Sequence, residues 1–225
     1  MKRFAVGFAA ATLAMMGITP PAIAAQPVNA PVPKRIAKEG AGLKTAIFAG
    51  GCFWGVEGVF SHVKGVKSAV VGYHGGTAAT AKYSSITAGG TSHAESVRIT
   101  YDPYVIRYDE LLRIFFSVAT DPTQKNRQGP DVGAHYRSAL VPMSAEQRKV
   151  AKAYLAQMQS SGVWRRPIVT QIESYRKFYR AEGYHQDYMV KNPTSRYIIA
   201  HDKPKVTALK RMFPSDYSPR FLRDG

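Results

Sequence analysis

The sequence predicts an α+β protein, a ferredoxin-like α/β sandwich in which helices cover one face of a mixed sheet. Strand-like and helical patterns follow one another in the order β-α-β-β-α-β and then α-β. Residues 94–101 alternate apolar and polar side chains with period two, which is typical of a half-buried strand. Residues 108–118 carry Leu111, Leu112, Phe115 and Phe116 at helical spacing. With 45% hydrophobic residues, the chain can form a full core.

The elements of the first half follow directly from these patterns. An apolar strand is expected over residues 44–49, and it leads into a helix over about 52–63. A valine-rich run at 66–73 predicts the second strand, and the alternating segment 94–101 the third.

In the second half, the helix over 108–118 is followed by a short strand at 138–141. Ser144-Ala-Glu-Gln147 has the pattern of a capping box and predicts a helix that runs to about residue 159. A last strand is expected at 168–172. The chain after Glu173 is less regular, so we expect an irregular C-terminal extension.

The N-terminus has the pattern of an export signal. Lys2 and Arg3 precede an apolar run over 4–18, and Ala22-Ile-Ala24 supplies small residues for cleavage. The run is shorter than the roughly 20 residues that span a bilayer, so no stable membrane anchor is expected. We therefore expect a periplasmic or secreted protein. The domain organisation expected is a signal peptide at 1–25, a flexible proline-containing linker at 26–42, the main domain at 43–214 and a tail at 215–225.

Cys52 is the single cysteine of the chain, and it lies at the predicted turn from strand to helix. Free N–H groups at a helix N-terminus favour the thiolate over the thiol, so we expect Cys52 to be acidic and nucleophilic. An unpaired thiol in an exported chain risks unwanted disulfides unless its chemistry is needed. This context favours a functional thiol over a buried structural one.

The net charge of +16 permits binding to nucleic acid or to anionic lipid surfaces. The basic residues are spread along the chain, however, and no zinc-finger or helix-turn-helix spacing accompanies them. We expect solvated positive surface and no nucleic-acid function. No spacing of ligands suggests a metal site, and no glycine-rich phosphate loop follows a strand.

A series of short segments, in one order along residues 44–192, resembles the signature segments of peptide methionine sulfoxide reductases of the A class. They are Gly51-Cys52-Phe53-Trp54-Gly55, Gly72-Tyr73-His74-Gly75-Gly76, His93-Ala94-Glu95, Tyr101-Asp102-Pro103, Asp121-Pro122-Thr123, Asn126-Arg127-Gln128-Gly129-Pro130-Asp131, Tyr136-Arg137-Ser138 and Ala181-Glu182-Gly183-Tyr184-His185-Gln186. The resemblance implies a peptide-methionine (S)-S-oxide reductase that repairs oxidised proteins.

The resemblance also implies a role for each matching residue. Cys52 would attack the sulfoxide sulfur and become a sulfenic acid. Glu95 would donate a proton to the sulfoxide oxygen, which requires burial to raise its pKa. Tyr83 and Tyr136 would hydrogen-bond the same oxygen. Asp131 would order water and Tyr136, and Phe53 and Trp54 would wall a pocket for the methyl group. His185 is expected to be structural.

The chain departs from the family pattern at several positions. Ala81-Lys82 precedes Tyr83 where many relatives carry Asn-Pro-Thr, Thr87-Ala88 stands where several carry a second cysteine, and Pro130 and His135 replace Asn and Gln. The tail at 215–225 has no resolving cysteine. We therefore expect no cofactor, an external reductant such as a thioredoxin-like protein, oxidised methionine as the substrate, and a monomer.

Two other classes of function stay open at this point. Cys52 could serve a hydrolase or acyltransferase, with His74 or His93 as its base. Alternatively, the chain could be a basic module without enzymatic activity that binds anionic surfaces.

Overall fold

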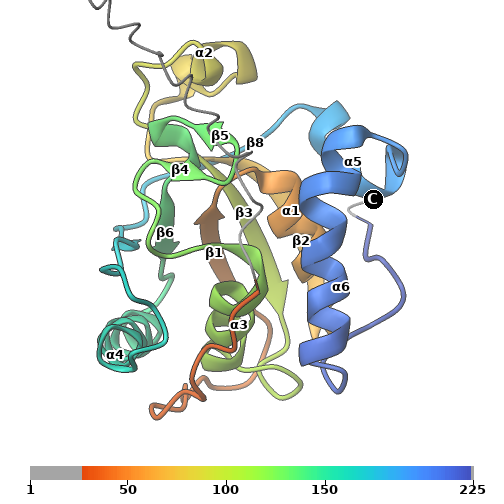
Figure 1. Ribbon diagram of the computed structural model, residues 1–225. Coiled ribbons are helices and arrows are strands. Elements are labelled where there is room, and N and C mark those ends of the chain that lie inside the picture. Colours follow the sequence, from red (N-terminus) through yellow and green to blue (C-terminus); the bar gives the residue numbers. More distant parts are fainter. Residues whose placement is uncertain (1–26, 224–225) are drawn as a thin grey trace, which may run out of the picture.

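The computed structural model describes residues 27–223 and contains one six-stranded sheet with strand order β7-β6-β1-β3-β2-β8 (Figure 1). The strands are β1 (Lys44–Gly50), β2 (Val66–His74), β3 (Ala94–Tyr101), β6 (Ser138–Val141), β7 (Gln171–Ile172) and β8 (Phe178–Arg180). The helices are α1 (Phe53–Phe60), α2 (Tyr83–Thr87), α3 (Tyr108–Ile114), α4 (Ala145–Ser160), α5 (Tyr188–Lys191) and α6 (Lys203–Met212). Two further strands, β4 (Arg127–Gln128) and β5 (Asp131–Val132), pair with each other to form a separate two-stranded ribbon.

The central strands have the topology of a ferredoxin-like sandwich. Neighbouring strands in β6-β1-β3-β2 are antiparallel, with α1 connecting β1 to β2 and α3 lying between β3 and β6 along the chain. The sheet is mixed because β7 pairs with β6 in parallel, whereas β8 adds an antiparallel edge beside β2. The predicted fold class is confirmed.

One face of the sheet carries the main core. Successive residues of a strand point to opposite faces, so Ala46 and Phe48 of β1 enter the main apolar cluster while Ile47 enters a smaller one. Helices α1, α3, α4 and α6 all contribute to the main cluster, as expected for helices on one face. Each fully buried Phe or Leu in it contributes roughly 1.5–3 kcal/mol relative to an exposed side chain.

The prediction of a flexible linker is wrong for residues 27–42, because this segment packs against the domain. Ala30 and Ala37 belong to the main core. The backbone of this segment finds hydrogen-bond partners on the helices: the Ala37 N–H donates to Asp109 Oδ1 (2.8 Å), and the Tyr154 hydroxyl donates to Pro31 O (2.7 Å). Polar backbone groups with such partners can lie against a core without a strand or helix of their own. The predicted signal peptide at 1–25 lies outside the described residues.

The predicted helix over 108–118 is present as α3 followed by a π-helical turn, Phe115–Ala119. The segment after Glu173 is more regular than expected, since it contains β8, α5 and α6. The last predicted strand is shorter than expected and covers only Gln171–Ile172. Within residues 27–223, no helix has the length and apolar character needed to cross a membrane.

Candidate active site

Cys52 lies at the point where β1 turns into α1. It is the N-terminal cap of the helix and is 7% exposed. The turn requires Gly51, whose φ is +91°, and a Cβ at this position would approach the Gln128 Cβ to 2.4 Å. Because other residues rarely adopt positive φ, glycine lets the chain reverse here and presents the sulfur at the helix N-terminus.

The prediction of an acidic thiol is wrong for the resting site. Burial raises the pKa of Cys52 well above its ordinary value, and the charges of Asp202 and Glu95 raise it further. Lys205 and a hydrogen bond with the Trp54 backbone lower the pKa, but by less. The helix N-terminus does favour the thiolate, as expected, yet loss of water and two nearby carboxylates outweigh it.

Glu95 lies on β3 and is 2% exposed. Burial raises the pKa of Glu95 to about 8, although the hydrogen bond that Phe53 N–H donates to its Oε2 (3.1 Å) acts in the opposite direction. A carboxyl with this pKa is largely protonated at neutral pH. The expectation that burial raises the pKa of Glu95 is confirmed, and the bond to Phe53 places the carboxyl beside the residue that follows Cys52.

Two tyrosines join the same site from separate elements. Tyr83 begins α2, and Tyr136 ends the 3-10 turn Ala134–Tyr136. Burial raises the pKa of Tyr83 to about 12, and Glu95 and Cys52 add to the shift. Burial and then the charges of Glu95 and Asp131 raise the pKa of Tyr136 well above its usual value. Both phenols are therefore neutral hydrogen-bond donors that share their surroundings with Cys52 and Glu95.

Asp131, on β5, accepts a hydrogen bond from the Tyr197 hydroxyl. This bond was not expected, since the resemblance pairs Asp131 with Tyr136. Tyr197 comes from the segment before α6, and its ring also packs edge-on against Trp54, with centroids 5.8 Å apart. The C-terminal segment thus reaches the site that the sequence placed among residues 52–136.

Phe53 and Trp54 form the aromatic side of the site. Phe53 is 1% exposed, whereas Trp54 is half-buried and stacks on Tyr188 with ring centroids 3.7 Å apart. The Trp54 Nε1–H donates to His185 Nδ1 (3.2 Å), which keeps the indole in one orientation. His185 is buried and burial lowers its pKa, so it serves as a neutral acceptor. This arrangement agrees with the structural role expected for His185.

A buried nucleophile, a protonated carboxyl, two phenols and an aromatic wall are the groups that sulfoxide reduction requires. Comparison with known proteins decides the family: residues 44–217 match the family model described as peptide methionine sulfoxide reductase. The chain belongs to this family.

Named relatives of this reductase cover most of its length. It is 51% identical over 183 residues to peptide methionine sulfoxide reductase MsrA 2 of Mesorhizobium japonicum, a match that covers 81% of this chain and 94% of the relative. A protein of the same name from Synechocystis is 49% identical over 179 residues, covering 80% and 82%. Among solved structures, reduced Mxr1 from Saccharomyces cerevisiae is similar with a TM-score of 0.63, 35% identity, and coverage of 75% and 96%.

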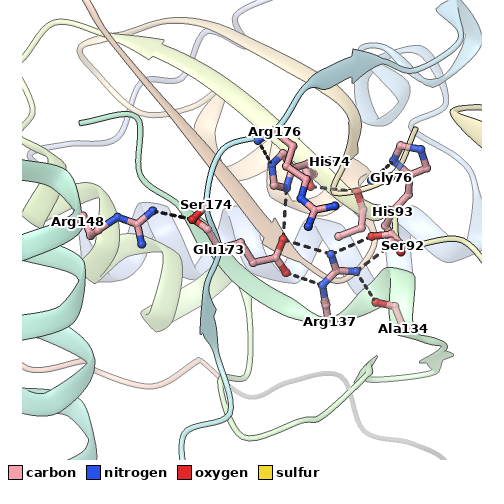
Figure 2. A network of polar contacts seen from close by, with 12 residues as sticks. His74, Gly76, Ser92, His93, Ala134, Arg137, Arg148, Glu173, Ser174 and Arg176 are labelled. Atoms are coloured by element: carbon pink, nitrogen blue, oxygen red, sulfur yellow. Dashed lines mark hydrogen bonds and ion pairs between the residues drawn. The ribbon is translucent and has the colours of Figure 1, made fainter. Parts of the chain in front are cut away.

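A polar network centred on Arg137 and Glu173 lies outside the pocket that Cys52 lines (Figure 2). The Arg137 guanidinium donates to Glu173 Oε1 (2.7 Å) and to the carbonyl oxygens of Ser92, His93 and Ala134. Burial would raise the pKa of Glu173, but hydrogen bonds from His74 and Arg137 lower it to about 2. The network therefore ties the chain just before Glu95 to the turn that ends at Tyr136.

The same network accounts for the two histidines considered as bases for Cys52. His74 accepts from the Arg176 N–H at Nε2 (3.2 Å), and its Nδ1 lies 3.3 Å from Glu173 Oε2. His93 accepts from the Gly76 N–H at Nδ1 (3.3 Å), and its Nε2 lies 3.0 Å from Thr77 O. Both nitrogens of each ring are used in these contacts, so the arrangement of a Cys-His hydrolase is not favoured.

Several residues of the site carried no assigned role in the sequence. Glu182 accepts from the Tyr83 N–H (2.9 Å) and the Tyr73 hydroxyl (2.7 Å), so it anchors the start of α2; it lies in a matching segment, which was its only signal. The C-terminal residues at the site had no recognisable spacing; these are Tyr188, Tyr197, Asp202 and Lys205. Within residues 27–223, no group of three His, Cys, Asp or Glu side chains could hold a metal ion.

Proposed function

We propose that this reductase repairs the S epimer of methionine sulfoxide in peptides and proteins by direct attack of Cys52 on the sulfoxide sulfur. The observation that carries the proposal is the buried carboxyl of Glu95, whose pKa is about 8 and which is hydrogen-bonded to the residue next to Cys52. A nucleophile beside a protonated carboxyl can attack sulfur while the sulfoxide oxygen receives a proton.

The chemical step balances in atoms and electrons. Cys52 Sγ forms a bond to the substrate sulfur, and Glu95 protonates the oxygen while Tyr83 and Tyr136 donate hydrogen bonds to it. The sulfur–oxygen bond of the substrate then breaks, and the released oxygen, as water or hydroxide, bonds to Cys52 Sγ. The bond between Cys52 Sγ and the substrate sulfur breaks at the same time, its electron pair stays on the methionine sulfur, and Cys52 is left as a sulfenic acid. Methionine gains the two electrons that the thiol loses. The rings of Phe53 and Trp54 hold the methyl group of the substrate against the sulfur.

Stereospecificity tests this proposal. We expect turnover of the S epimer and none of the R epimer, because one nucleophile, one oxygen site and one methyl pocket cannot fit the mirror arrangement around sulfur. Each epimer of a peptide-bound methionine sulfoxide is offered separately with a dithiol, and methionine is quantified. Comparable turnover of both epimers contradicts the proposed geometry.

Recycling of Cys52 needs an external thiol, because this chain carries one cysteine. The incoming thiolate attacks the Cys52 sulfenic acid, a mixed disulfide forms and water leaves, and a second thiolate restores Cys52. A thioredoxin-like dithiol fits this chemistry. The export pattern at residues 1–25 supports a periplasmic or secreted location, where the donor is an exported thioredoxin-like domain.

A reaction without reductant measures the same cycle. We expect about one methionine per chain with excess S-sulfoxide, since one sulfenic acid can form, and a sulfenic-acid reagent should then label Cys52. Adding dithiol afterwards should restore turnover. Sustained turnover without any thiol, or a label on another residue, would show the cycle to be wrong.

A further inference from the structure

A buried ion pair lies beside Cys52 and has no part in the mechanism above. Lys205 Nζ lies 3.3 Å from Asp202 Oδ1, with the Asp202 side chain fully buried and Lys205 15% exposed. Asp202 Oδ2 is also buried and has no hydrogen-bond partner among the described residues. Lys205 and Cys52 line one pocket, together with Gln128, Gly129, Pro130, Asp131, Tyr197 and His201.

Gly55 shows how close this pair lies to the helix that Cys52 caps. Gly55 is in the first turn of α1, and a Cβ there would meet Asp202 Oδ1 at 2.1 Å and Lys205 Nζ at 2.6 Å. Any larger residue would displace the pair. The absence of a side chain at this position therefore allows both charges to reach the turn that presents the sulfur.

We propose that the Asp202–Lys205 pair controls whether Cys52 is a thiol or a thiolate. Lys205 is the counter-ion of the thiolate, and the Asp202 carboxylate competes with the sulfur for that cation. The proposal rests on Cys52 being the nucleophile, as assigned above. Asp202 and Lys205 act through Cys52 and are positioning residues in this scheme.

The physical basis is the cost of an unpaired charge in a buried site. One cation can stabilise one neighbouring anion well, so a thiolate is favoured when Asp202 is protonated and disfavoured when Asp202 is ionised. Burial raises the pKa of Asp202, which brings its protonated form within reach. The signs agree for Cys52, whose pKa is raised by Asp202 and lowered by Lys205.

Other titratable groups face Cys52 and bear on its ionisation. They are Glu95 of β3, Asp131 of β5, the phenols Tyr83, Tyr136 and Tyr197, and His201 in the shared pocket. Asp202 opposes the thiolate, as does Glu95 once it is ionised, and the phenols stay neutral because their pKa values are raised. Lys205 is thus the group that must supply positive charge against them.

Alkylation of Cys52 by iodoacetamide, measured against pH, tests the proposal without using a sulfoxide. Lys205→Met should slow alkylation at pH 7.5 about tenfold and move the profile to higher pH, whereas Asp202→Asn should speed it and move the profile to lower pH. Lys205→Arg should keep the wild-type profile. Lys210→Met, an exposed change on the same helix, is the matched control and should alter nothing.

Opposite shifts in the Lys205→Met and Asp202→Asn profiles support the pair as the control of ionisation, since a merely structural role would change the access of the reagent in the same direction for both. Unchanged profiles, or shifts in one direction for both, overturn it. If Asp202→Asn fails to fold, the contrast of Lys205→Met with Lys205→Arg and Lys210→Met decides. Shifts of the expected sign in a protein that reduces no sulfoxide would refute only the proposed function.

Discussion

Replacing Cys52 with serine should abolish methionine formation, with a loss of about 10³-fold or more in kcat. Serine keeps the shape of the turn but ionises far less readily than cysteine, and its oxygen cannot take up the oxygen of the substrate as a sulfenic acid does. Reduction of peptide-bound S-sulfoxide is followed with excess dithiol, so recycling does not limit the rate.

The fold provides the control for this variant. Cys52 is buried with no disulfide, and serine is smaller and polar, so thermal unfolding of the variant should remain cooperative with at most a modest loss of stability. Lys210→Met should retain full activity as a variant remote from the pocket. Turnover by a well-folded Cys52→Ser protein would remove Cys52 from the mechanism.

Glu95→Gln should lower the rate of the reductive step by about 10²–10⁴-fold with little effect on substrate binding. Glutamine keeps the shape of the side chain and can accept the Phe53 N–H, but it cannot deliver a proton. Single-turnover formation of methionine isolates this step from recycling. Tyr136→Phe is the comparison, and its loss should be smaller because Tyr83 still contacts the oxygen. A wild-type rate in Glu95→Gln would exclude general acid catalysis by this residue.

The pH dependence of the same step follows from the pKa of Glu95. The wild-type rate should fall as the pH rises through about 8, because the acid is then ionised, and this fall should be absent from the residual rate of Glu95→Gln. The raised pKa also means that folding stability declines as the pH rises from the unfolded carboxyl range through about 8. Glu95→Gln should lose that decline, so a slow but alkali-stable variant is expected.

Local patterns predicted the central elements well. The alternation at 94–101 became β3, the capping box at Ser144 became the start of α4, where Ser144 Oγ accepts from the Gln147 N–H, and the apolar run at 44–49 became β1. Each of these elements is determined by residues a few positions apart, so a short stretch of sequence is enough to predict it. The resemblance to the reductase family likewise assigned Cys52, Glu95, Tyr83 and Tyr136 to one catalytic site before the structure was considered.

The properties that the sequence did not predict depend on burial and on partners distant along the chain. The packing of residues 27–42 requires the hydrogen-bonding groups of α3 and α4. The bond from Tyr197 to Asp131, and the pair beside Gly55, join the C-terminal segment to the first helix and the ribbon. No periodicity marks such contacts, because they are made only once the sheet brings its edges and helices together.

Cys52 shows which of its properties come from the local sequence and which come from the tertiary structure. The residues around Cys52 determine that a thiol is presented at a helix N-terminus, since Gly51 permits the turn and α1 follows at once. Its protonation was decided by tertiary structure alone. The pKa of Cys52 is set by the loss of water in the core, by the carboxylates of Glu95 and Asp202, and by Lys205. These effects appear only in the folded chain, because electrostatic energy depends on distance and burial.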